Sequence, residues 1–307
     1  MKNLSFALPG AVTGILVLAA ATSPAHAAER TLDLTSVPTA ITQPGTYVAR
    51  RDWQLDWGTN SSAGIVVTAD DVVIDLRGFT INGVSRGMVI KVKGNNVTVR
   101  GGQLNSSAQD GSYAIRSSGV ATHVEDMHIY SLDGVILLGS NAVVRNSVLN
   151  GKFDLVHVGA EALVEGNGIS GTNFPLTLEG DRSVAVRNRI SGGSGAVNIR
   201  GNQNLFSDNV VSAVIDFDNG ITVDGSYNTL ARNTMYPQFG TMISINGTAN
   251  TIEGTIAPPT ADSEGPSNRG IVFLASGNFF GNNRLWAEVP YELNGTQQTD
   301  WGGNVSY

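Results

Sequence analysis

A repeat of about 21 residues constrains the fold of this chain more than any other feature. Three consecutive rows, residues 135–154, 155–174 and 175–195, read VILLGSNAVVRNSVLNGKFD, LVHVGAEALVEGNGISGTNF and PLTLEGDRSVAVRNRISGGSG. Each row combines a short alternating apolar segment, a Gly or Ser turn, a second segment, a bend and a third segment. One row is too short to enclose a core, whereas rows stacked in parallel bury a continuous column of aliphatic side chains. The repeat therefore predicts an all-β chain of stacked parallel strands.

Asparagine recurs at the bend of successive rows. The positions are Asn146, Asn167, Asn188, Asn209, Asn233 and Asn283. Asparagine tolerates a left-handed backbone, and its amide can hydrogen-bond to the next asparagine above and below. We therefore predict a structural asparagine ladder that runs along the stack.

The repeat, together with the opening ITQPGTYVARRDWQL and the following IVVTADDVVIDLRGFTING, resembles the right-handed parallel β-helix of pectate-lyase-like proteins. The resemblance covers roughly residues 41–305 and implies a single-domain, all-β, right-handed parallel β-helix of about ten coils. It also implies a groove along the first strand of each row, where many members act on acidic polysaccharides. The DPHD motif of alginate epimerases, the paired Asp and RIK motifs of polygalacturonases and the pectin methylesterase signatures are missing from the sequence. The resemblance is therefore to an architecture and carries no catalytic residue over.

The N-terminal segment has the pattern of a secretory signal. Lys2 precedes an apolar run, and Ala25-His26-Ala27 then supplies a small-residue cleavage site. We expect a signal peptide at 1–27, an N-terminal cap segment at 28–63 and the parallel β-helix at 64–307. This pattern predicts a secreted or periplasmic protein. No membrane insertion is expected, because the apolar run is too short to span a bilayer comfortably and no second one follows.

The amino-acid composition limits the kinds of ligand that the chain is expected to bind and the means by which it is stabilised. The net charge of −7 argues against a general nucleic-acid binder, so an anionic ligand needs a local positive patch. There is no cysteine, so the folded chain depends on core burial for its stability.

Alternation along the first segment of each row sends every second side chain to the outer surface. Parallel strands lie about 4.8 Å apart, so equivalent side chains of successive rows are predicted to be neighbours. One outward column reads Val66, Lys91, Arg116, Leu137, His157, Thr177, Asn198, Thr222, Ser244 and Phe273. The next outward column reads Thr68, Lys93, Ser118, Gly139, Gly159, Glu179, Arg200, Asp224, Asn246 and Ala275.

Three cations in these columns have no acidic neighbour. Lys91, Lys93 and Arg116 lie within about one strand spacing of one another, and like charges at that distance repel. We predict that an external carboxylate or sulfate binds among them. The alternative is an internal acid from the N-terminal segment, the candidates being Asp33, Asp52 and Asp56.

His157 is the only histidine of the two columns. An unperturbed imidazole pKa near 6.5 suits proton transfer, so His157 joins Lys91 and Arg116 as a candidate catalytic residue. The alternative is an ordinary surface histidine. His123 and His128 belong to the second segment of their row and are assigned to structure.

Four further residues are predicted to bind substrate together with Lys93. They are Glu179, Asn198, Arg200 and Asp224. The alternative for the three charged members is a self-neutralising ladder without a ligand, because opposite charges on neighbouring strands stabilise a sheet by a few tenths of a kcal/mol.

No metal site or resident cofactor is predicted from motif spacing. Asp216, Asp218 and Asn219 supply oxygen ligands of the kind that calcium takes, with a solvated acidic loop as the alternative. Trp53, Trp57 and Tyr113 are candidates for sugar stacking or for plugging the end of the core.

The favoured function is action on an acidic, uronate-containing polysaccharide by β-elimination or C5 epimerisation, as a polysaccharide lyase first of all. Both reactions need a cation at the carboxylate and a base for the C5 proton, which Lys91, Arg116 and His157 can supply. One alternative is a non-catalytic glycan-binding or structural β-helix. A glycoside hydrolase using Glu179 and Asp224 is a third hypothesis, but two strand spacings, about 10 Å, slightly exceed the separation of an inverting pair.

Overall fold

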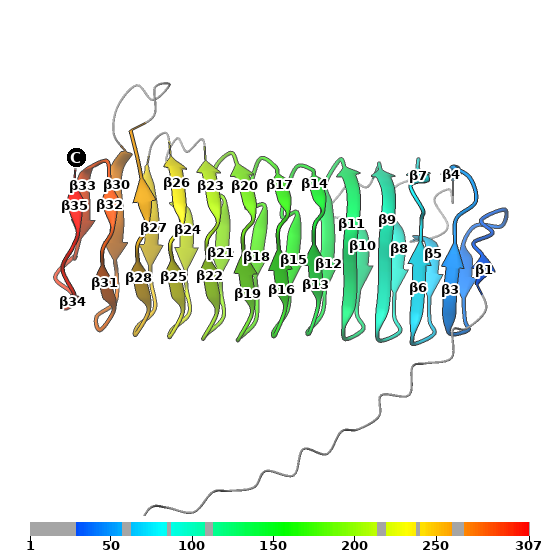
Figure 1. The fold of residues 1–307 in the computed structure, drawn as a ribbon, viewed down its shortest axis with the longest axis horizontal. Coiled ribbons are helices and arrows are strands. Elements are labelled where there is room, and N and C mark those ends of the chain that lie inside the picture. Colours follow the sequence, from blue (N-terminus) through cyan, green and yellow to red (C-terminus); the bar gives the residue numbers. More distant parts are fainter. Residues whose placement is uncertain are drawn as a thin grey trace, which may run out of the picture.

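The chain forms a solenoid of stacked parallel strands (Figure 1). This computed structural model describes residues 29–56, 63–84, 87–107, 113–213, 219–237, 240–259 and 267–306. All regular elements in these ranges are β-strands, in agreement with the predicted right-handed parallel β-helix. No helix in the described ranges is long and apolar enough to cross a membrane. The predicted signal peptide, Trp57, Asp216 and Asp218 lie outside the described residues.

One sheet carries the predicted outward columns and is called the first sheet. It has twelve strands within the described residues. In spatial order they are β2 (Thr39–Ile41), β5 (Ala63–Val67), β8 (Met88–Val92), β10 (Tyr113–Ser117), β12 (Gly134–Leu138), β15 (Val156–Val158), β18 (Leu176–Leu178), β21 (Val197–Ile199), β24 (Asn219–Val223), β27 (Thr241–Ile245), β30 (Ser267–Phe273) and β33 (Ala287–Glu292).

The second sheet bends around the rest of each turn in two runs of strands. The first run is β1 (Arg30–Thr31), β3 (Gly45–Val48), β6 (Val72–Asp75), β9 (Val97–Ser106), β11 (Thr122–Ser131), β13 (Val143–Arg145), β16 (Leu163–Glu165), β19 (Val184–Val186), β22 (Leu205–Ser207), β25 (Thr229–Ala231), β28 (Thr251–Glu253), β31 (Phe279–Gly281) and β34 (Thr299–Asp300). The second run is β4 (Trp53–Leu55), β7 (Thr80–Gly83), β14 (Val148–Asn150), β17 (Gly168–Ser170), β20 (Arg189–Gly192), β23 (Val210–Ala213), β26 (Thr234–Pro237), β29 (Ile256–Ala257), β32 (Arg284–Leu285) and β35 (Val305–Ser306). The long strands β9 and β11 pair with members of both runs and join them.

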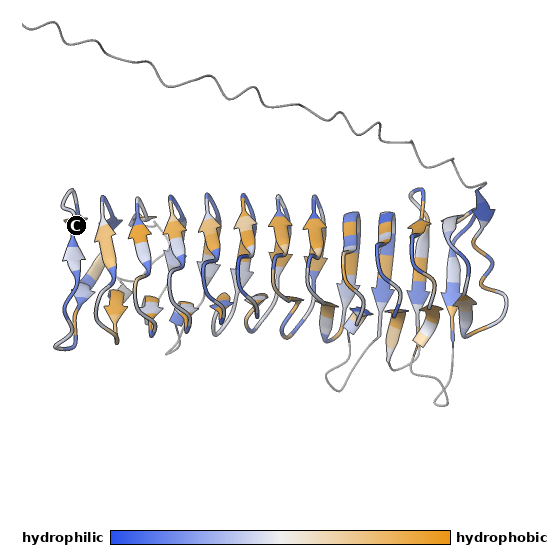
Figure 2. Ribbon diagram, turned by 90° about the horizontal axis from the view of Figure 1, so that it is seen from below, coloured by the Kyte–Doolittle hydropathy of each residue, from blue (hydrophilic) through white to orange (hydrophobic). Residues whose placement is uncertain are grey.

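The core is a column of aliphatic side chains between the sheets. Parallel register stacks one inward side chain of the first sheet on the next, and each is fully buried. They are Ile65, Ile90, Ile115, Ile136, Val156, Leu176, Val197, Ile221, Ile243 and Ile271. Hydrophobic strands recur turn after turn through the middle of the stack (Figure 2). This uninterrupted burial provides the main driving force for folding.

The predicted asparagine ladder forms at the bend between the two runs. The Asn167 amide donates to the Asn188 Oδ1 at 3.0 Å, and Asn188 donates in the same way to Asn209 at 3.0 Å. These side chains are buried, and Asn188 also donates to the Val164 carbonyl at 2.9 Å. Two details of the prediction are wrong. The left-handed residue is the one before each ladder position, such as Arg187 (φ 56°), and Asn146 (φ 50°) occupies that preceding place, next to the buried Ser147.

A second buried ladder runs along another corner of the stack. Asn204, Asn228 and Asn250 donate successively from one amide to the next at 3.1 Å, 3.1 Å and, to Asn278, 3.2 Å. The side-chain oxygens also accept backbone N–H groups of the preceding turn. Both ladders therefore satisfy backbone groups that the bends would otherwise bury without partners.

Asn188→Ala is expected to lower the free energy of unfolding by about 1–3 kcal/mol, because it leaves buried partners in the adjoining turns unsatisfied. The loss is measured by chemical denaturation at one pH. Asn202→Ala is the matched control, since Asn202 is exposed and bonded to Asp181 on the surface. Equal stability of the two variants would contradict a structural role for the buried amide.

Candidate active site

The register of the first sheet brings the outward side chains into one line, as the alternation predicts. Lys91 pairs with Arg116, Leu137 follows, and His157 pairs with both Leu137 and Thr177. The line continues to Asn198, Thr222 and Ser244.

The predicted line is wrong at its last position. Ser244 pairs with Val272, while Phe273 pairs with Ile245 and is fully buried. In the second column Leu274, whose N–H bonds to Ile245, takes the place expected for Ala275. A slip by one residue reverses the face of every side chain in a strand, and the long row before β30 offers no fixed count from the preceding bend.

The three cations of the second and third turns meet on the outer face. Lys91 and Arg116 are direct cross-strand neighbours, and the N–H of Lys93, just after β8, donates to the carbonyl of Val67 at the end of β5. None of the three side chains makes a hydrogen bond or ion pair with a described residue. Three like charges therefore lie together with no ion pair to an acid of the described residues.

Two of the acids considered as internal partners bond elsewhere. The Asp33 carboxylate accepts the Thr35 N–H at 3.0 Å. Asp52 accepts the Thr80 N–H at 2.8 Å. Asp33 and Asp52 therefore bind backbone N–H groups of the N-terminal turns. Neither forms an ion pair with the cations of β8 and β10.

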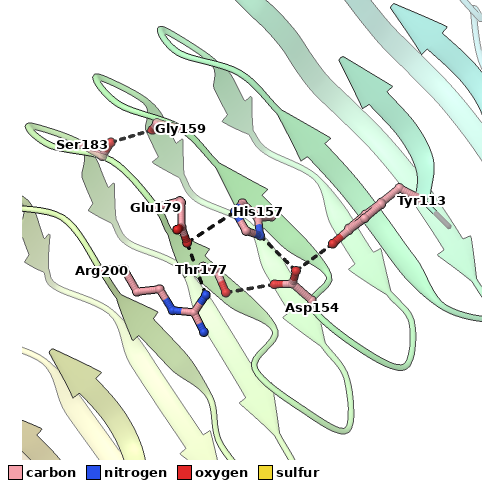
Figure 3. A network of polar contacts seen from close by, with 8 residues as sticks. All are labelled: Tyr113, Asp154, His157, Gly159, Thr177, Glu179, Ser183 and Arg200. Carbon is pink, nitrogen blue, oxygen red and sulfur yellow. Dashed lines mark hydrogen bonds and ion pairs between the residues drawn. The ribbon is translucent and has the colours of Figure 1, made fainter. Parts of the chain in front are cut away.

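His157 lies in a polar network that extends from Tyr113 on β10 to Arg200 just after β21 (Figure 3). Its Nδ1 is 3.0 Å from the Asp154 Oδ2, and its Nε2 is 3.7 Å from the Glu179 Oε2. The Tyr113 hydroxyl donates to the same Asp154 oxygen at 2.7 Å, and the Thr177 hydroxyl donates to the other at 2.9 Å. The imidazole is thus held between two carboxylates, tightly on the Asp154 side and loosely on the Glu179 side.

Local backbone and packing set this arrangement. Asp154 sits just before β15 with a left-handed backbone (φ 41°), and its N–H bonds to the Asn173 carbonyl of the next turn. The Tyr113 ring lies over Gly134, where an added Cβ would come within 2.5 Å of the ring. A side chain at Gly134 would therefore push the phenol away from Asp154.

Sequence reasoning missed Asp154 and the role of Tyr113. Neither belongs to the two outward columns from which the catalytic and substrate-binding residues were predicted, and Tyr113 was considered only for sugar stacking or for plugging the core. The available signal was local, since Asp154 precedes His157 by three residues.

Two pKa shifts follow from the network. Burial alone would raise the pKa of Asp154, but hydrogen bonds from His157 and Tyr113, the charge of His157 and the Thr177 hydroxyl hold it below the usual value. Burial, the hydrogen bond to Asp154 and the charges of Asp154 and Asp133 raise the pKa of Tyr113 well above its usual value. At neutral pH Asp154 is therefore a carboxylate and Tyr113 a neutral phenol. A carboxylate at Nδ1 fixes the imidazole orientation and favours the tautomer whose Nε2 can accept a proton.

The three-residue charge ladder predicted downstream forms only in part among the described residues. The Arg200 Nη1 is 3.4 Å from the Glu179 Oε2, and both side chains are about half exposed. Asp224 instead accepts from the Asn246 amide at 2.5 Å. Asn198 is buried, and with Arg200 it lines a pocket of about 240 Å³ whose other lining residues are Phe153, Asp154, Asn173, Phe174 and Thr177.

The uncharged side chain of Leu137 lies between Arg116 and His157 on the outer face. Because the three residues lie in the same column, Arg116 and His157 are two strand spacings, about 10 Å, apart. Gly139 and Gly159 occupy the neighbouring column, where an added Cβ at Gly139 would lie 2.7 Å from the Gly119 carbonyl. This turn therefore presents a flat surface with a cation on one side and the imidazole on the other.

Other candidates play no part in this arrangement. His123 and His128 lie on β11 in the second sheet, as predicted. Trp53 packs against the core near the N-terminal end. Within the described ranges no group of three or more metal-ligating side chains is found.

The acid-range stability of the protein is expected to depend on Asp154. Its folded-state pKa is lowered, so its stabilising contribution is present above an ordinary carboxyl pKa of about 3.9 and is lost as the pH falls through the folded value. Unfolding of wild type and Asp154→Asn, followed by denaturant between neutral and acidic pH, should show a shallower acid decline for the variant. Parallel curves would contradict the network.

Neither a family model nor a curated protein sequence matches this chain. Among solved structures the fold is similar to the Dettilon tailspike protein, with a TM-score of 0.59, 11% identity, and 89% of this chain and 60% of the tailspike covered. It is also similar to the Azotobacter vinelandii mannuronan C-5 epimerase AlgE6 A-module, with a TM-score of 0.51, 13% identity, and 91% of this chain and 99% of the module covered. The chain thus spans about 60% of the tailspike's length. At these identities the likeness shows a shared fold, the parallel β-helix.

Proposed function

We propose that this chain is an exported enzyme that removes the C5 proton of a uronate unit in an acidic polysaccharide, leading to β-elimination or to epimerisation. The observation that carries the proposal is the alignment of three cations without a described ion-pair partner and an Asp154-oriented histidine on one face, with the uncharged Leu137 between them. Export rests on the signal-like pattern of residues 1–27. One of the solved structures with a similar fold is the A-module of a mannuronan C-5 epimerase, which is chemistry of the same class.

The reacting sugar is placed over Leu137, Gly139 and Gly159. Arg116 then faces the carboxylate from one side, and His157 faces the ring from the other. Neutralising a carboxylate acidifies the adjacent C5–H bond, so that a base of ordinary strength can remove the proton. His157 Nε2 is the base, because Asp154 engages Nδ1.

Tyr113 supplies a proton donor beside that base. Its hydroxyl shares the Asp154 Oδ2 with His157 Nδ1, and its raised pKa keeps it protonated. In elimination the C5 electrons form the double bond to C4 while the glycosidic oxygen leaves and takes a proton, which a neutral phenol can give. In epimerisation a proton returns to the opposite face of C5.

The site requires a chain-like ligand. Lys91 and Asn198 are separated by five strand spacings, about 24 Å along the sheet. A monosaccharide cannot reach both ends, whereas an oligosaccharide along the solenoid contacts the cations, His157 and the pocket at Asn198 together.

The test is incubation of the mature protein with a panel of uronate polymers in D₂O. Ultraviolet absorbance of a 4,5-unsaturated uronate reports elimination, and deuterium at C5 without that absorbance reports epimerisation. Binding to a polymer with neither product would support the alternative of a non-catalytic glycan-binding module. Absence of both binding and turnover across the panel would contradict the proposal.

A further inference from the structure

The two sides of His157 along the outer face differ in charge. On the side of β8 and β10 the face carries Lys91, Lys93 and Arg116, with no acid paired to them among the described residues. On the side of β18 to β24 it carries Glu179 and Asp224, with Arg200 as the one cation. The formal charge is therefore three positive on one side and one negative on the other.

The single cation of the second side is already engaged. Arg200 contacts the Glu179 carboxylate at 3.4 Å, so its charge is shared within the protein. Farther along the same sheet Arg269 is paired with Glu292 at 3.1 Å. The described outward residues between them are uncharged apart from Asp224, examples being the exposed Asn246 and Leu274.

The pocket beside Arg200 combines aromatic and polar lining residues with two groups of opposite charge, Asp154 and Arg200. The Lys152 ammonium lies 5.2 Å from the centroid of the Phe153 ring. Phe153 is exposed, and Phe153 and Phe174 supply aromatic surface on which a sugar ring can stack. The Asn173 Oδ1, which belongs to the same lining, is buried with no hydrogen-bond partner among the described residues. Such an acceptor matches a hydroxyl donor and repels a carboxylate.

We propose that the substrate is a mixed acidic polysaccharide, in which the part of the chain bound on the Arg200 side of the reacting uronate contains an uncharged hexose. This inference rests on the proposed function and specifies its substrate class. Uronate carboxylates on the β8 and β10 side meet cations. A homopolymer of uronates would also place carboxylates toward Glu179 and Asp224, where like charges are unfavourable.

The test compares two oligosaccharides of equal length, one an alternating uronate and neutral hexose, the other uronate throughout. Wild type is expected to show kcat/KM at least about fivefold higher on the mixed chain, the effect of one unfavourable exposed charge contact. Asp224→Lys should raise the ratio of homopolymer to mixed-chain kcat/KM by about fivefold or more. Glu253→Lys on β28, in the second sheet, is the matched control and should leave this ratio unchanged.

Each outcome decides between the two proposals. Equal or better turnover of the homopolymer by wild type would leave the proposed function standing and overturn the mixed-substrate inference. An Asp224→Lys ratio equal to that of Glu253→Lys would overturn it as well. Absence of turnover on both oligosaccharides, and on the wider panel, would contradict the proposed function itself.

Discussion

His157→Gln is expected to lower kcat on the responsive polymer by about 10²–10⁴-fold, the usual contribution of a positioned general base. Glutamine keeps a polar group near Asp154 but cannot accept the C5 proton at neutral pH. KM should change much less, because Lys91, Lys93 and Arg116 still bind the carboxylates. The measurement is steady-state kinetics with ultraviolet or deuterium readout, accompanied by circular dichroism to verify the β-sheet spectrum.

His128→Gln is the matched control, since His128 is exposed on β11 in the second sheet. It should retain wild-type kcat. A His157→Gly variant adds a direct chemical readout, because free imidazole in solution should restore part of the lost rate if only the base is missing. Full activity of His157→Gln would assign the proton abstraction to another residue.

Lys91→Glu is expected to weaken polymer binding by about 30-fold at low salt, because an attractive exposed contact of about 1 kcal/mol is replaced by a repulsive one of similar size. The difference should shrink as salt is added, since the screening length falls to about 10 Å at 0.1 M. The free energy of unfolding should stay equal or rise slightly, because the substitution relieves repulsion with Arg116. Binding is measured by titration at several salt concentrations, and stability by denaturant.

The control for this charge reversal is Arg189→Glu, which changes an exposed cation on β20 of the second sheet. It should leave binding unchanged. A Lys91→Glu variant that loses stability while binding normally would mean that the lysine is paired within the protein, which contradicts an anion site.

The outward line of the first sheet could be predicted from sequence because two periods act together. Alternation fixes which side chains of a strand face outward, and a nearly constant row length fixes which of them become neighbours. The pairing of Lys91 with Arg116 and the position of His157 follow from these two rules alone. The predicted register is wrong by one residue at Val272. The preceding row is longer there, so the number of residues from the bend to the strand no longer follows the repeat.

The partners of His157 could not be predicted in the same way. Asp154 and Tyr113 lie at strand starts, where direction depends on the path of each turn and on small neighbours such as Gly134. Their contact crosses 41 residues of sequence and two turns of the solenoid. Tyr113, Gly134 and Asp154 hold equivalent positions in three successive rows, so the repeat places them in one line. The repeat does not say whether a side chain at the start of a strand turns outward, and the contact depends on that direction.

The asparagine ladders constrain how such a chain can change its length. The backbone N–H and side-chain amide of Asn188 donate hydrogen bonds to Asn209 of the next turn, and Asn209 donates in the same way to Asn233. Each rung of the ladder is therefore equivalent to the next. Insertion of one residue at the bend would move an amide out of line and leave two turns with buried groups unbonded. Duplication or loss of a whole turn would bring another equivalent amide into the vacant place. Rungs separated by 21, 24 or 28 residues stay in line, so a coil can vary in length in the loops between the bends. At the bend itself, the protein can lengthen or shorten only by one complete coil.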